Sequence, residues 1–479
     1  MGEGQVVIAS NRGPVSFSMS ESGRLSARRG GGGLVSGLSA AADEERALWI
    51  CAALSDADRQ AARYAADGRL DTAGYDPGGA TVRMLNIPPA TLHRAYNSVA
   101  NSLLWFCHHM LFDIPNKPAF DTASEREWAS YREYNAAFAD AMAHDAGERA
   151  RTMVQDYHLT LTPLMLRERR PDLRIAHFSH TPWAPRDYFR LLPDDVAREL
   201  LLGMLGADHV GFLAQRWADA FMDCCADVLG ANVDRTHGTV TNGGRVTRVG
   251  VHPLGVDGPA LCERGSAADV LARERSLREQ VGDRALIVRV DRTELSKNIV
   301  RGLAAYRELL VTYPEWRGRV VHVAFAYPSR HDLPEYREYT AEVQRIAARI
   351  TDEFATADWD PLVLQVYDDY PRSLAAYRLA DVLLVNPIRD GMNLVAKEGA
   401  VLSRRDAALV LSREAGAAAE LGADALTVNP YDVTGTARAL HEALSMDRAE
   451  RAARHARLAE AATAMPPHRW FRDQLDALG

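Results

Sequence analysis

The sequence predicts an α/β protein built from two doubly wound, Rossmann-like domains with parallel sheets. Short apolar runs alternate with amphipathic helical stretches along the whole chain, a pattern typical of parallel strands joined by covering helices. The length of 479 residues is sufficient for two or three domains that each bury a core. A segment rich in proline and glycine, residues 252–265, interrupts the alternation and indicates a join between domains.

Nine apolar runs are predicted to form buried strands, and the longer amphipathic stretches are predicted to form helices. The strands are expected at residues 6–10, 47–54, 174–180, 209–214, 285–290, 319–326, 362–367, 381–387 and 407–412. Helices are expected between them, at residues 194–205, 298–313 and 334–350.

The join defines the expected domains. Residues 1–255 are predicted to form the N-terminal domain and residues 256–454 the C-terminal domain, with a charged helix at 268–280 just after the join. The C-terminal segment, about 455–479, ends in an amphipathic helix and is expected to pack back on the N-terminal domain. Because ligands of doubly wound sheets bind at the carboxyl ends of the strands, we expect the two domains to face a central cleft.

The composition argues against several classes of function. A formal net charge of −8 disfavours general affinity for nucleic acid or an anionic membrane. The apolar runs are far shorter than the ~20 residues that cross a bilayer, and the first residues lack the pattern of a secretory signal. Five sparse cysteines without a Cys-x-x-Cys pair indicate neither a disulfide framework nor a cysteine zinc site. These features predict a cytoplasmic protein without nucleic-acid or membrane partners.

Two groups of polar residues follow strands in the first domain. Arg12 follows the first strand, and the glycine run 30–33 opens a helix, an arrangement that suits an anionic ligand but is also typical of a surface turn. Asp156 and His180 end two successive apolar stretches, where a carboxylate and an imidazole suit sugar hydroxyls. Each alone also fits a capping or core residue, and their pairing favours a binding site.

Cations follow strands in the second domain. Arg292 and Lys297 lie five residues apart between a strand and a helix, and Arg330 follows the next strand. Such cations would stabilise a diphosphate as a leaving group without a metal, although a solvated surface pair is the simpler alternative for each alone.

The string RDGMNLVAKE (389–398) follows the predicted strand at 381–387. Asp390 lies in the turn and can accept hydrogen bonds from sugar hydroxyls, while backbone N–H groups at the start of the next helix can hold phosphate. An Asp-Gly turn with a helix cap explains only part of this string, because it leaves Asn393, Lys397 and Glu398 without a reason.

Taken together, these strings closely resemble the trehalose-6-phosphate synthases, retaining glucosyltransferases of family 20 with the GT-B fold. The shared strings run in order from residue 6 to about residue 445: SNR (10–12), DYHL (156–159), HTPW (180–183), Arg292 with Lys297, PSR (328–330) and RDGMNLVAKE. The resemblance implies transfer of glucose from a nucleoside diphosphate glucose to glucose 6-phosphate. The substrates implied are GDP-glucose or UDP-glucose and glucose 6-phosphate, and a homo-oligomer is left open.

The resemblance also assigns roles to individual residues. The acceptor would meet Arg12, Tyr96, Trp105, Asp156 and Arg330. The donor would meet Gly33, Arg292, Lys297, Asp368, Asp390, Met392, Asn393, Leu394 and Glu398. The catalytic set would be His180, Asp156, Arg292, Lys297 and Asp390, acting in a front-face reaction in which the departing phosphate oxygen accepts the acceptor's proton. No metal or other cofactor is expected for the chemical step.

The sequence departs from the family pattern at three places. The usual Arg-x-Asp-Tyr-x-Lys-Gly string is Arg-Thr-Glu-Leu-Ser-Lys-Asn at residues 292–298, and Cys51 and Ala52 stand where a tryptophan is expected. The segment aligned with the base-binding loop, VYDDYPRS (366–373), carries Asp368 and Asp369. A carboxylate accepts both N1–H and N2–H of guanine, whereas uracil offers one N–H between carbonyl oxygens. The sequence therefore favours GDP-glucose over UDP-glucose.

Two alternatives stand beside this interpretation. One is a pseudo-glycosyltransferase that couples cyclitol units, like validoxylamine-phosphate synthase, although such relatives tend to lose parts of the RDGMNLVAKE string. The other is a catalytically silent sugar-phosphate sensor, which predicts missing cations, whereas Arg12, Arg292, Lys297 and Arg330 are all present.

Overall fold

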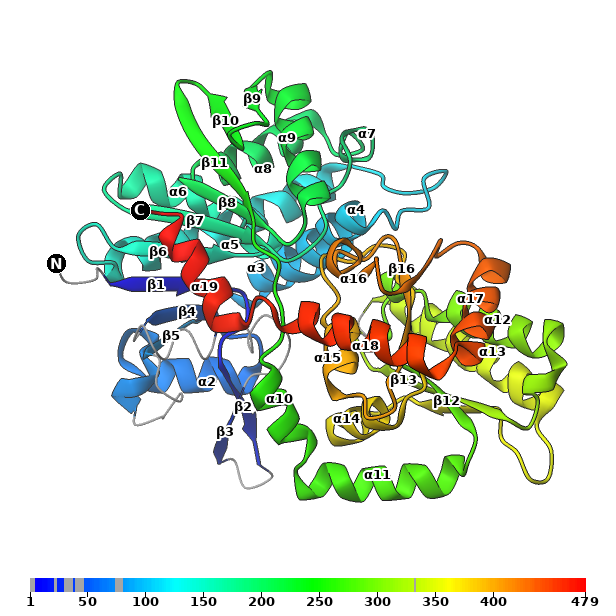
Figure 1. The fold of residues 1–479 in the computed structure, drawn as a ribbon. Coiled ribbons are helices and arrows are strands. Elements are labelled where there is room, and N and C mark those ends of the chain that lie inside the picture. Colours follow the sequence, from blue (N-terminus) through cyan, green and yellow to red (C-terminus); the bar gives the residue numbers. More distant parts are fainter. Residues whose placement is uncertain (1–4, 21–23, 30–37, 39–46, 74–80, 331–332) are drawn as a thin grey trace. The chain divides into compact units, whose positions relative to one another are not determined.

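The chain divides into two compact units, each built around its own sheet (Figure 1). The computed structural model describes residues 5–20, 24–29, 38, 47–73, 81–330 and 333–479. Unit 1 holds Met1–Leu254 and Pro467–Gly479, and unit 2 holds Gly255–Pro466. The first break between the units therefore falls one residue before the join expected from the sequence.

Unit 1 contains a nine-stranded sheet in the order β5-β4-β1-β6-β7-β8-β11-β10-β9. Neighbouring strands from β5 to β11 are parallel. In sheet order the strands are Thr81–Leu85, Leu48–Ala52, Val6–Ala9, Arg151–Gln155, Arg174–Ser179, His209–Phe212, Arg245–Val251, Thr239–Asn242 and Asn232–Asp234.

One edge of this sheet differs from the expected parallel arrangement. Strands β11, β10 and β9 pair antiparallel. The reason is the turn between β10 and β11, where Gly243 and Gly244 have φ of 55° and 82°, the left-handed geometry that joins two strands in a tight hairpin. A second hairpin, β2 (Val15–Met19) with β3 (Leu25–Arg29), stands apart from the main sheet.

Helices connect the strands of unit 1. The α8 helix has the bounds expected from the sequence, and the π-helix η3 between α3 and α4 carries Tyr96. Among the described residues the main helices are α2 (Asp56–Tyr64), α3 (Pro89–His93), η3 (Arg94–Leu104), α4 (Trp105–His109), α5 (Thr122–Asp145), α6 (Thr162–Arg169), α7 (Arg186–Phe189), α8 (Asp194–Leu205) and α9 (Gln215–Leu229).

Unit 2 contains a six-stranded sheet in the order β14-β13-β12-β15-β16-β17, and all of its strands are parallel. Helices cover both faces of such a sheet, which explains why its strands are almost continuous apolar runs. The strands in sheet order are Leu362–Gln365, Val320–Tyr327, Ala285–Arg292, Val382–Val385, Ala408–Ser412 and Leu426–Val428.

The helices of unit 2 begin directly after the break between the units. The second half of the proline- and glycine-rich segment forms α10, capped by Asp257, and the charged helix expected next is α11. The helices are α10 (Gly258–Gly265), α11 (Ala268–Val281), α12 (Ile299–Thr312), α13 (Pro334–Phe354), α14 (Tyr370–Leu379), α15 (Leu394–Leu402), α16 (Ala418–Leu421), α17 (Val433–Ser445) and α18 (Arg448–Thr463).

The chain returns to unit 1 later than the sequence analysis expected. Helix α18 still belongs to unit 2, where it packs on α15, and only the segment from Pro467 belongs to unit 1. Pro466 lies between α18 and α19 (Pro467–Asp476), and the next proline, Pro467, is the first residue of α19, a position that tolerates proline. Figure 1 shows α19, in red, beside the strands of unit 1, where the Trp470 indole donates to the His252 carbonyl at 3.0 Å. In the described part of the chain, no helix is long and apolar enough to cross a membrane.

Candidate active site

Asp156 and His180 come together at the carboxyl ends of the neighbouring parallel strands β6 and β7. The Asp156 carboxylate accepts a hydrogen bond from the backbone N–H of His180 at 3.2 Å, and the Asp156 N–H donates to the Phe178 carbonyl at 2.7 Å. Asp156 has φ 71° and ψ 171°, a conformation that is costly for a residue with a side chain. The fold therefore holds this carboxylate in a strained position beside His180.

The His180 ring is enclosed by neutral groups. Its Nε2 lies 2.8 Å from the side-chain oxygen of Gln155, and its ring contacts Phe178 and Trp470 with centroid distances of 4.8 and 5.6 Å. Burial, reinforced by His177, lowers the pKa of His180 to about 3. The imidazole is therefore neutral at pH 7 and suits hydrogen bonding to an uncharged sugar.

Arg12 and Tyr96 are linked to Asp156 through His158. The Arg12 guanidinium donates to the Tyr96 hydroxyl at 3.3 Å, and the Tyr96 ring stacks on His158 with centroids 5.7 Å apart. His158 Nδ1 lies 3.9 Å from the Asp156 carboxylate. Three of the predicted acceptor residues thus form one group, and the sequence analysis missed His158, although it lies in the same DYHL string.

Trp105 supports this group from the core. Its ring is buried, stacks on His109 at 3.8 Å and contacts Tyr157 at 5.7 Å, while the Tyr157 hydroxyl donates to Asn101 at 3.0 Å. Trp105 therefore packs against the residue that follows Asp156. Gly33 and the rest of the glycine run 30–33 lie outside the described residues.

In unit 2, Lys297 and Asp390 form a mostly buried ion pair. Lys297 ends the short helix η5 (Leu295–Lys297) after β12, Asp390 follows β15, and the Lys297 ammonium donates to the Asp390 carboxylate at 2.5 Å. Burial alone would lower the pKa of Lys297, but Asp390, with Asp291 and Glu294, raises it above its ordinary value. Lys297 is therefore charged, and its partner is the acid expected to bind the sugar.

Glu294 is a buried carboxylate that the sequence analysis did not assign. It is 0% exposed, lies 3.1 Å from the Arg292 guanidinium and accepts from the Ser329 hydroxyl at 2.9 Å. Burial would raise the pKa of Glu294, but Arg292, Arg330 and Lys297 lower it to about 2. Glu294 thus pairs with Arg292 and lies in the field of Arg330 and Lys297. The sequence held a signal for it, because Glu294 replaces the aspartate of the family string.

Arg330 belongs to unit 2, whereas Arg12, its expected partner in phosphate binding, belongs to unit 1. The Arg330 guanidinium donates to the Tyr336 hydroxyl at 2.7 Å, and its backbone has a positive φ of 43°. Within unit 2, Arg330 and Arg292 both lower the pKa of Glu294, so the two guanidiniums act on the same buried carboxylate.

Asn298 stands where the family string has glycine, and its backbone conformation is one that glycine favours. Its φ of 58° and ψ of 37° are left-handed, a region that favours glycine and in which asparagine is tolerated best among larger residues. Its buried amide donates to the carbonyls of Asn386 and Pro430 at 2.9 and 2.8 Å. The substitution therefore preserves the turn that carries Lys297.

The start of α15 gathers the remaining donor residues of the RDGMNLVAKE string. Asn393 caps the helix by accepting from the Ala396 N–H at 3.2 Å, and its side-chain amide donates to Asp390 at 3.1 Å. Met392 is buried, and Leu394 is the first helical residue. One turn further along, burial raises the pKa of Glu398 to about 7.

The backbone around Asp390 is fixed by a neighbouring loop. The Asp390 N–H donates to the Glu414 carbonyl at 3.2 Å, and the Gly416 N–H donates to the Asp390 carbonyl at 3.0 Å. A side chain at Gly416 would overlap the Gly391 carbonyl oxygen, so this close approach requires glycine.

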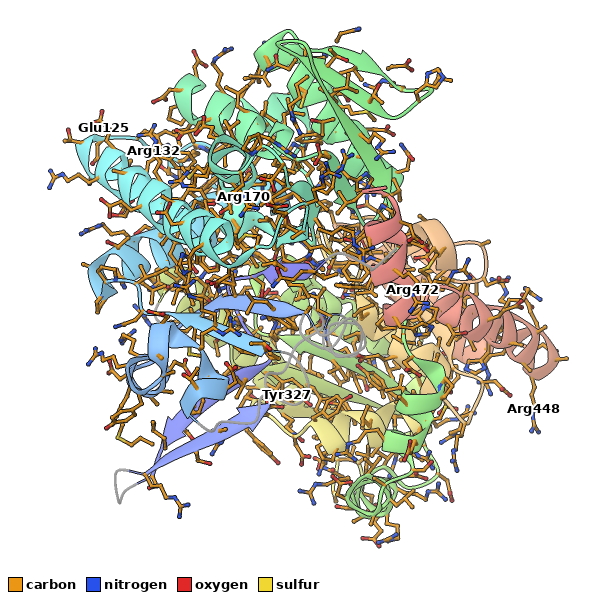
Figure 2. The ribbon with its side chains drawn as sticks, turned by 90° about the vertical axis from the view of Figure 1, so that its left-hand side faces the viewer. Glu125, Arg132, Arg170, Tyr327, Arg448 and Arg472 are labelled. Carbon is orange, nitrogen blue, oxygen red and sulfur yellow. The ribbon has the colours of Figure 1, made fainter. Side chains whose placement is uncertain are left out.

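The two acidic residues after β14 have different surroundings. Asp369 caps α14 by accepting from the Arg372 N–H at 3.1 Å, and it pairs with Arg273 at 2.9 Å. The Tyr327 hydroxyl, labelled in Figure 2, donates to the Asp369 carbonyl at 3.2 Å. Asp368 is exposed, and no side-chain hydrogen bond or ion pair joins it to another described residue. Asp368 is thus the more accessible of the two carboxylates.

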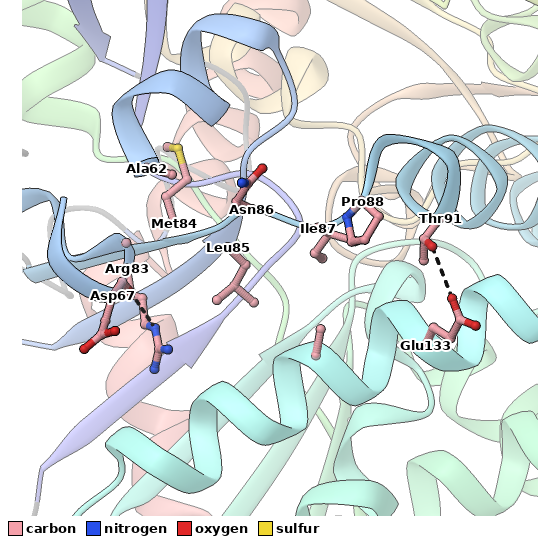
Figure 3. Close-up of a pocket in the computed structure, with 12 residues that line it drawn as sticks. Ala62, Asp67, Arg83, Met84, Leu85, Asn86, Ile87, Pro88, Thr91 and Glu133 are labelled. Atoms are coloured by element: carbon pink, nitrogen blue, oxygen red, sulfur yellow. Dashed lines mark hydrogen bonds between the residues drawn. The ribbon is translucent and has the colours of Figure 1, made fainter. Parts of the chain in front are cut away.

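A cavity of about 480 Å³ in unit 1 lies elsewhere, between β5, α3 and α5 (Figure 3). None of the predicted site residues lines the described part of this cavity. Two of its charged side chains have partners: Arg83 pairs with Asp145 at 2.7 Å and donates to the Asp67 backbone carbonyl, and Glu133 accepts from the Thr91 hydroxyl at 3.1 Å. In the described residues, no group of three or more His, Cys, Asp or Glu is arranged to hold a metal ion.

Sequence comparison decides the family. The sequence model of glycosyltransferase family 20 matches residues 4–479. The chain belongs to glycosyltransferase family 20. This is the family that the resemblance implied.

This chain spans different shares of the relatives that it matches. A bifunctional trehalose-6-phosphate synthase/phosphatase from Thermoproteus tenax is 36% identical over 80% of this chain, and the chain spans 51% of that protein. A trehalose-6-phosphate synthase from Mycobacterium avium is 34% identical, with 100% of this chain and 96% of that protein covered.

Solved structures of family 20 proteins share the fold. An α,α-trehalose-phosphate synthase (UDP-forming) from Burkholderia xenovorans, in complex with glucose 6-phosphate, is 28% identical with a TM-score of 0.86, and 99% of this chain and 100% of that chain are covered. A structure from E. coli bound with UDP-2-fluoro glucose is 28% identical with a TM-score of 0.85 and covers 99% of this chain and 98% of that one. The predicted GT-B fold is confirmed.

Proposed function

We propose that this family 20 enzyme is a trehalose-6-phosphate synthase that transfers glucose from a nucleoside diphosphate glucose to glucose 6-phosphate with retention of configuration. The observation that carries the proposal is the grouping in unit 2 of Arg292, Lys297 and Asp390 with the start of α15. Cations suit a diphosphate, and the carboxylate suits the hydroxyls of the sugar attached to it. The names of the relatives from Mycobacterium avium and Burkholderia xenovorans support the same activity.

Donor binding would open the ion pair between Lys297 and Asp390. The diphosphate would take Lys297 and Arg292 as partners, together with the backbone N–H groups of Met392, Asn393 and Leu394 at the start of α15. Asp390, still held by the Asn393 amide, would then accept from glucose hydroxyls. Glu398 would bind the ribose, and its pKa of about 7 would allow it both to donate and to accept there.

Acceptor binding would use the group in unit 1. Arg12 and Tyr96 present a guanidinium and a hydroxyl to the phosphate of glucose 6-phosphate, and the resemblance assigns Arg330 to the same phosphate. Asp156 would accept from the sugar hydroxyls, with Trp105 packed behind it through Tyr157. Gly33 would contribute backbone N–H contact.

The proposed reaction takes place on one face of the glucose. The bond from C1 to the phosphate oxygen breaks, the bond from C1 to the acceptor oxygen forms, and the acceptor's proton moves to the departing phosphate oxygen. Arg292 and Lys297 stabilise the negative charge of the leaving group, so the step is proposed to need no metal. Asp156 accepts from the His180 N–H and Asp390 from the Asn393 amide, contacts that suit positioning rather than nucleophilic attack.

We propose GDP-glucose as the preferred donor. Asp368 supports this choice, because an exposed carboxylate on the loop after β14 can accept both N–H groups of a guanine edge. UDP-glucose is the natural competitor, since the Burkholderia xenovorans relative is named UDP-forming.

The test is an assay of nucleoside diphosphate release with GDP-, UDP-, ADP- and TDP-glucose, each with and without glucose 6-phosphate. We expect release that depends on glucose 6-phosphate, turnover highest with GDP-glucose, and an α,α-linked product by NMR. Efficient turnover with UDP-glucose and none with GDP-glucose would overturn the donor preference and leave the synthase activity standing. Binding of glucose 6-phosphate without release from any donor would overturn the synthase proposal in favour of a sensor.

A further inference from the structure

Gln155, the last residue of β6, makes the hydrogen bond that reaches the His180 ring. Its side chain is fully buried, and its amide oxygen lies 2.8 Å from His180 Nε2. The next residue, Asp156, holds the backbone N–H of His180. Two consecutive residues at the end of one strand therefore fix His180 at its ring and at its backbone.

An amide oxygen can only accept a hydrogen bond, so the contact favours the tautomer of His180 that has a proton to donate. In a neutral imidazole one nitrogen carries the proton and the other carries a lone pair. The structure turns the amide oxygen of Gln155 toward Nε2, and the tautomer that completes this hydrogen bond carries its proton on Nε2 and its lone pair on Nδ1.

The surroundings of Gln155 indicate that this contact has a cost. The amide nitrogen of Gln155 is buried and has no hydrogen-bond partner among the described residues. A buried donor without a partner is unfavourable, and an apolar side chain of similar size would avoid it. The amide nitrogen thus has no partner in the described part of the chain, while the amide oxygen of the same side chain makes the hydrogen bond to His180.

The ring of His180 is held on its other sides as well. Phe178 of β7 packs edge-on against it, and Trp470 of α19 contacts it at a centroid distance of 5.6 Å. His177 is the titratable neighbour that acts on His180, and Asp156 faces its backbone. These neighbours limit rotation of the ring and leave Gln155 to select its tautomer.

We propose that Gln155 is a positioning residue that keeps His180 in the Nε2–H tautomer, so that Nδ1 is the acceptor for a hydroxyl of the transferred sugar. The inference rests on the proposed function for the identity of the sugar, because that proposal places His180 at the transferred glucose. A neutral acceptor suits this place, since a charged imidazolium would oppose the positive charge that develops at the sugar carbon.

The direct test is NMR of the full chain labelled with ¹⁵N-histidine, using long-range ¹H–¹⁵N correlation at pH 7. The His180 signals are assigned by their loss in His180→Gln. We expect a protonated Nε2 and an unprotonated Nδ1 in the wild-type chain. An Nδ1–H tautomer or an imidazolium in the wild-type chain would overturn the proposal without any variant at Gln155.

Substitution of Gln155 extends the test to activity. Gln155→Met keeps the size and removes the acceptor, so we expect a mixture of tautomers. We expect kcat to fall by about 10- to 100-fold, at or below the lower end of the ~10²–10⁴-fold that a positioned acid or base contributes, with little change in KM for glucose 6-phosphate. The matched control is Gln215→Met on α9, where an exposed glutamine donates to Asp219, and it should leave both readouts unchanged. An unchanged tautomer in Gln155→Met would contradict the proposal.

Gln155→Glu provides a variant that keeps an acceptor at the same place. We expect the proton to remain on Nε2, while the acid limb of the kcat profile moves to higher pH because a neighbouring carboxylate favours the imidazolium. If the acid limb of Gln155→Glu lay at the same pH as in the wild-type enzyme, the result would contradict a contact between residue 155 and the His180 ring. Failure of the proposed function is separable: if wild-type enzyme releases no nucleoside diphosphate from any donor, that proposal fails, whereas the NMR result still decides the tautomer.

Discussion

In unit 1 the predicted site residues are held by hydrogen bonds and ring contacts, whereas in unit 2 they are held by ion pairs. Asp156 accepts from the His180 N–H, and the His180 ring lies between Gln155, Phe178 and Trp470. In unit 2, Lys297 pairs with Asp390 and Arg292 with Glu294.

The difference indicates how each group would respond to its ligand. The contacts of unit 1 are directional and suit the hydroxyls of a sugar without rearrangement. In unit 2, Lys297 already donates to Asp390, so on the proposed function a diphosphate would compete with an internal partner for the ammonium. The loop stays in place because buried Arg289 donates to Asp291 at 2.7 Å and to the Lys297 carbonyl at 3.1 Å.

The largest effect is expected from Lys297→Met, which removes the charge that exchanges partners. Loss of one preorganised charge lowers kcat by about 10²–10³-fold. The measurement is nucleoside diphosphate release, with Lys297→Arg as the control that keeps the charge and loses less. Activity near wild type in Lys297→Met would mean that the ion pair of unit 2 is structural and that the comparison between the units is wrong.

An intermediate effect is expected from acid, and it should fall on unit 1. Burial lowers the pKa of His177 to about 4 and the pKa values of His180 and His209 to about 3, each below the ordinary value of 6.5. The unfolded chain therefore binds protons that the folded chain does not, and stability falls as pH drops below 6.5. Each such histidine contributes a loss of up to about 1.4 kcal/mol per pH unit until its folded pKa is reached.

Unit 2 has opposing groups over the same pH range. Burial lowers the pKa of His322 to about 3, so His322 destabilises the folded state on acidification. Burial raises the pKa of Glu398 to about 7, so between pH 7 and pH 4.5 its protonation favours the folded state. Hydrogen exchange at pH 7 and pH 5, corrected for intrinsic rates, should show greater loss of protection in β6, β7 and β8 than in β12 and β13. Substitution of the exposed His237 by asparagine is the control, and it should leave the difference in lost protection between the two units unchanged. Equal losses of protection in both units would contradict the prediction.

The smallest effect is expected from the turn at Asn298. Asn298→Gly keeps the left-handed backbone and removes two side-chain hydrogen bonds, so we expect a loss of about 1–2 kcal/mol in the free energy of unfolding. Asn298→Ala removes the same bonds and adds strain of about 1 kcal/mol. Denaturant unfolding measures both. Equal losses would show that the backbone conformation of the turn contributes nothing to holding Lys297.

The sequence predicted unit 2 better than unit 1, for a physical reason. The strands of unit 2 are buried on both faces, so β13 is apolar except for His322 and β12 begins with the apolar run 285–288. In unit 1 the sequence analysis did not assign strands to β5 (TVRML) or β6 (RTMVQ), because each carries polar or charged residues among few apolar ones. The hairpin of β10 and β11 depends on two glycines rather than on hydrophobicity.

The candidate site shows a similar limit. Lys297 and Asp390 could be predicted as site residues from their strings, but their ion pair could not, because it joins positions far apart in the chain. The same holds for Gln155 and His180, whose contact depends on the register that sets Gln155 opposite Phe178. Glu294 was visible in the sequence, but its importance follows from burial among cations.

The position of α19 has a consequence for the order in which the molecule matures during translation. Trp470, which contacts the His180 ring and the Phe178 ring, leaves the ribosome after every residue of unit 2. A nascent chain ending at Leu254 would therefore lack the Trp470 contacts of these two rings, and the finished surroundings of His180 arise only in the last stage of synthesis.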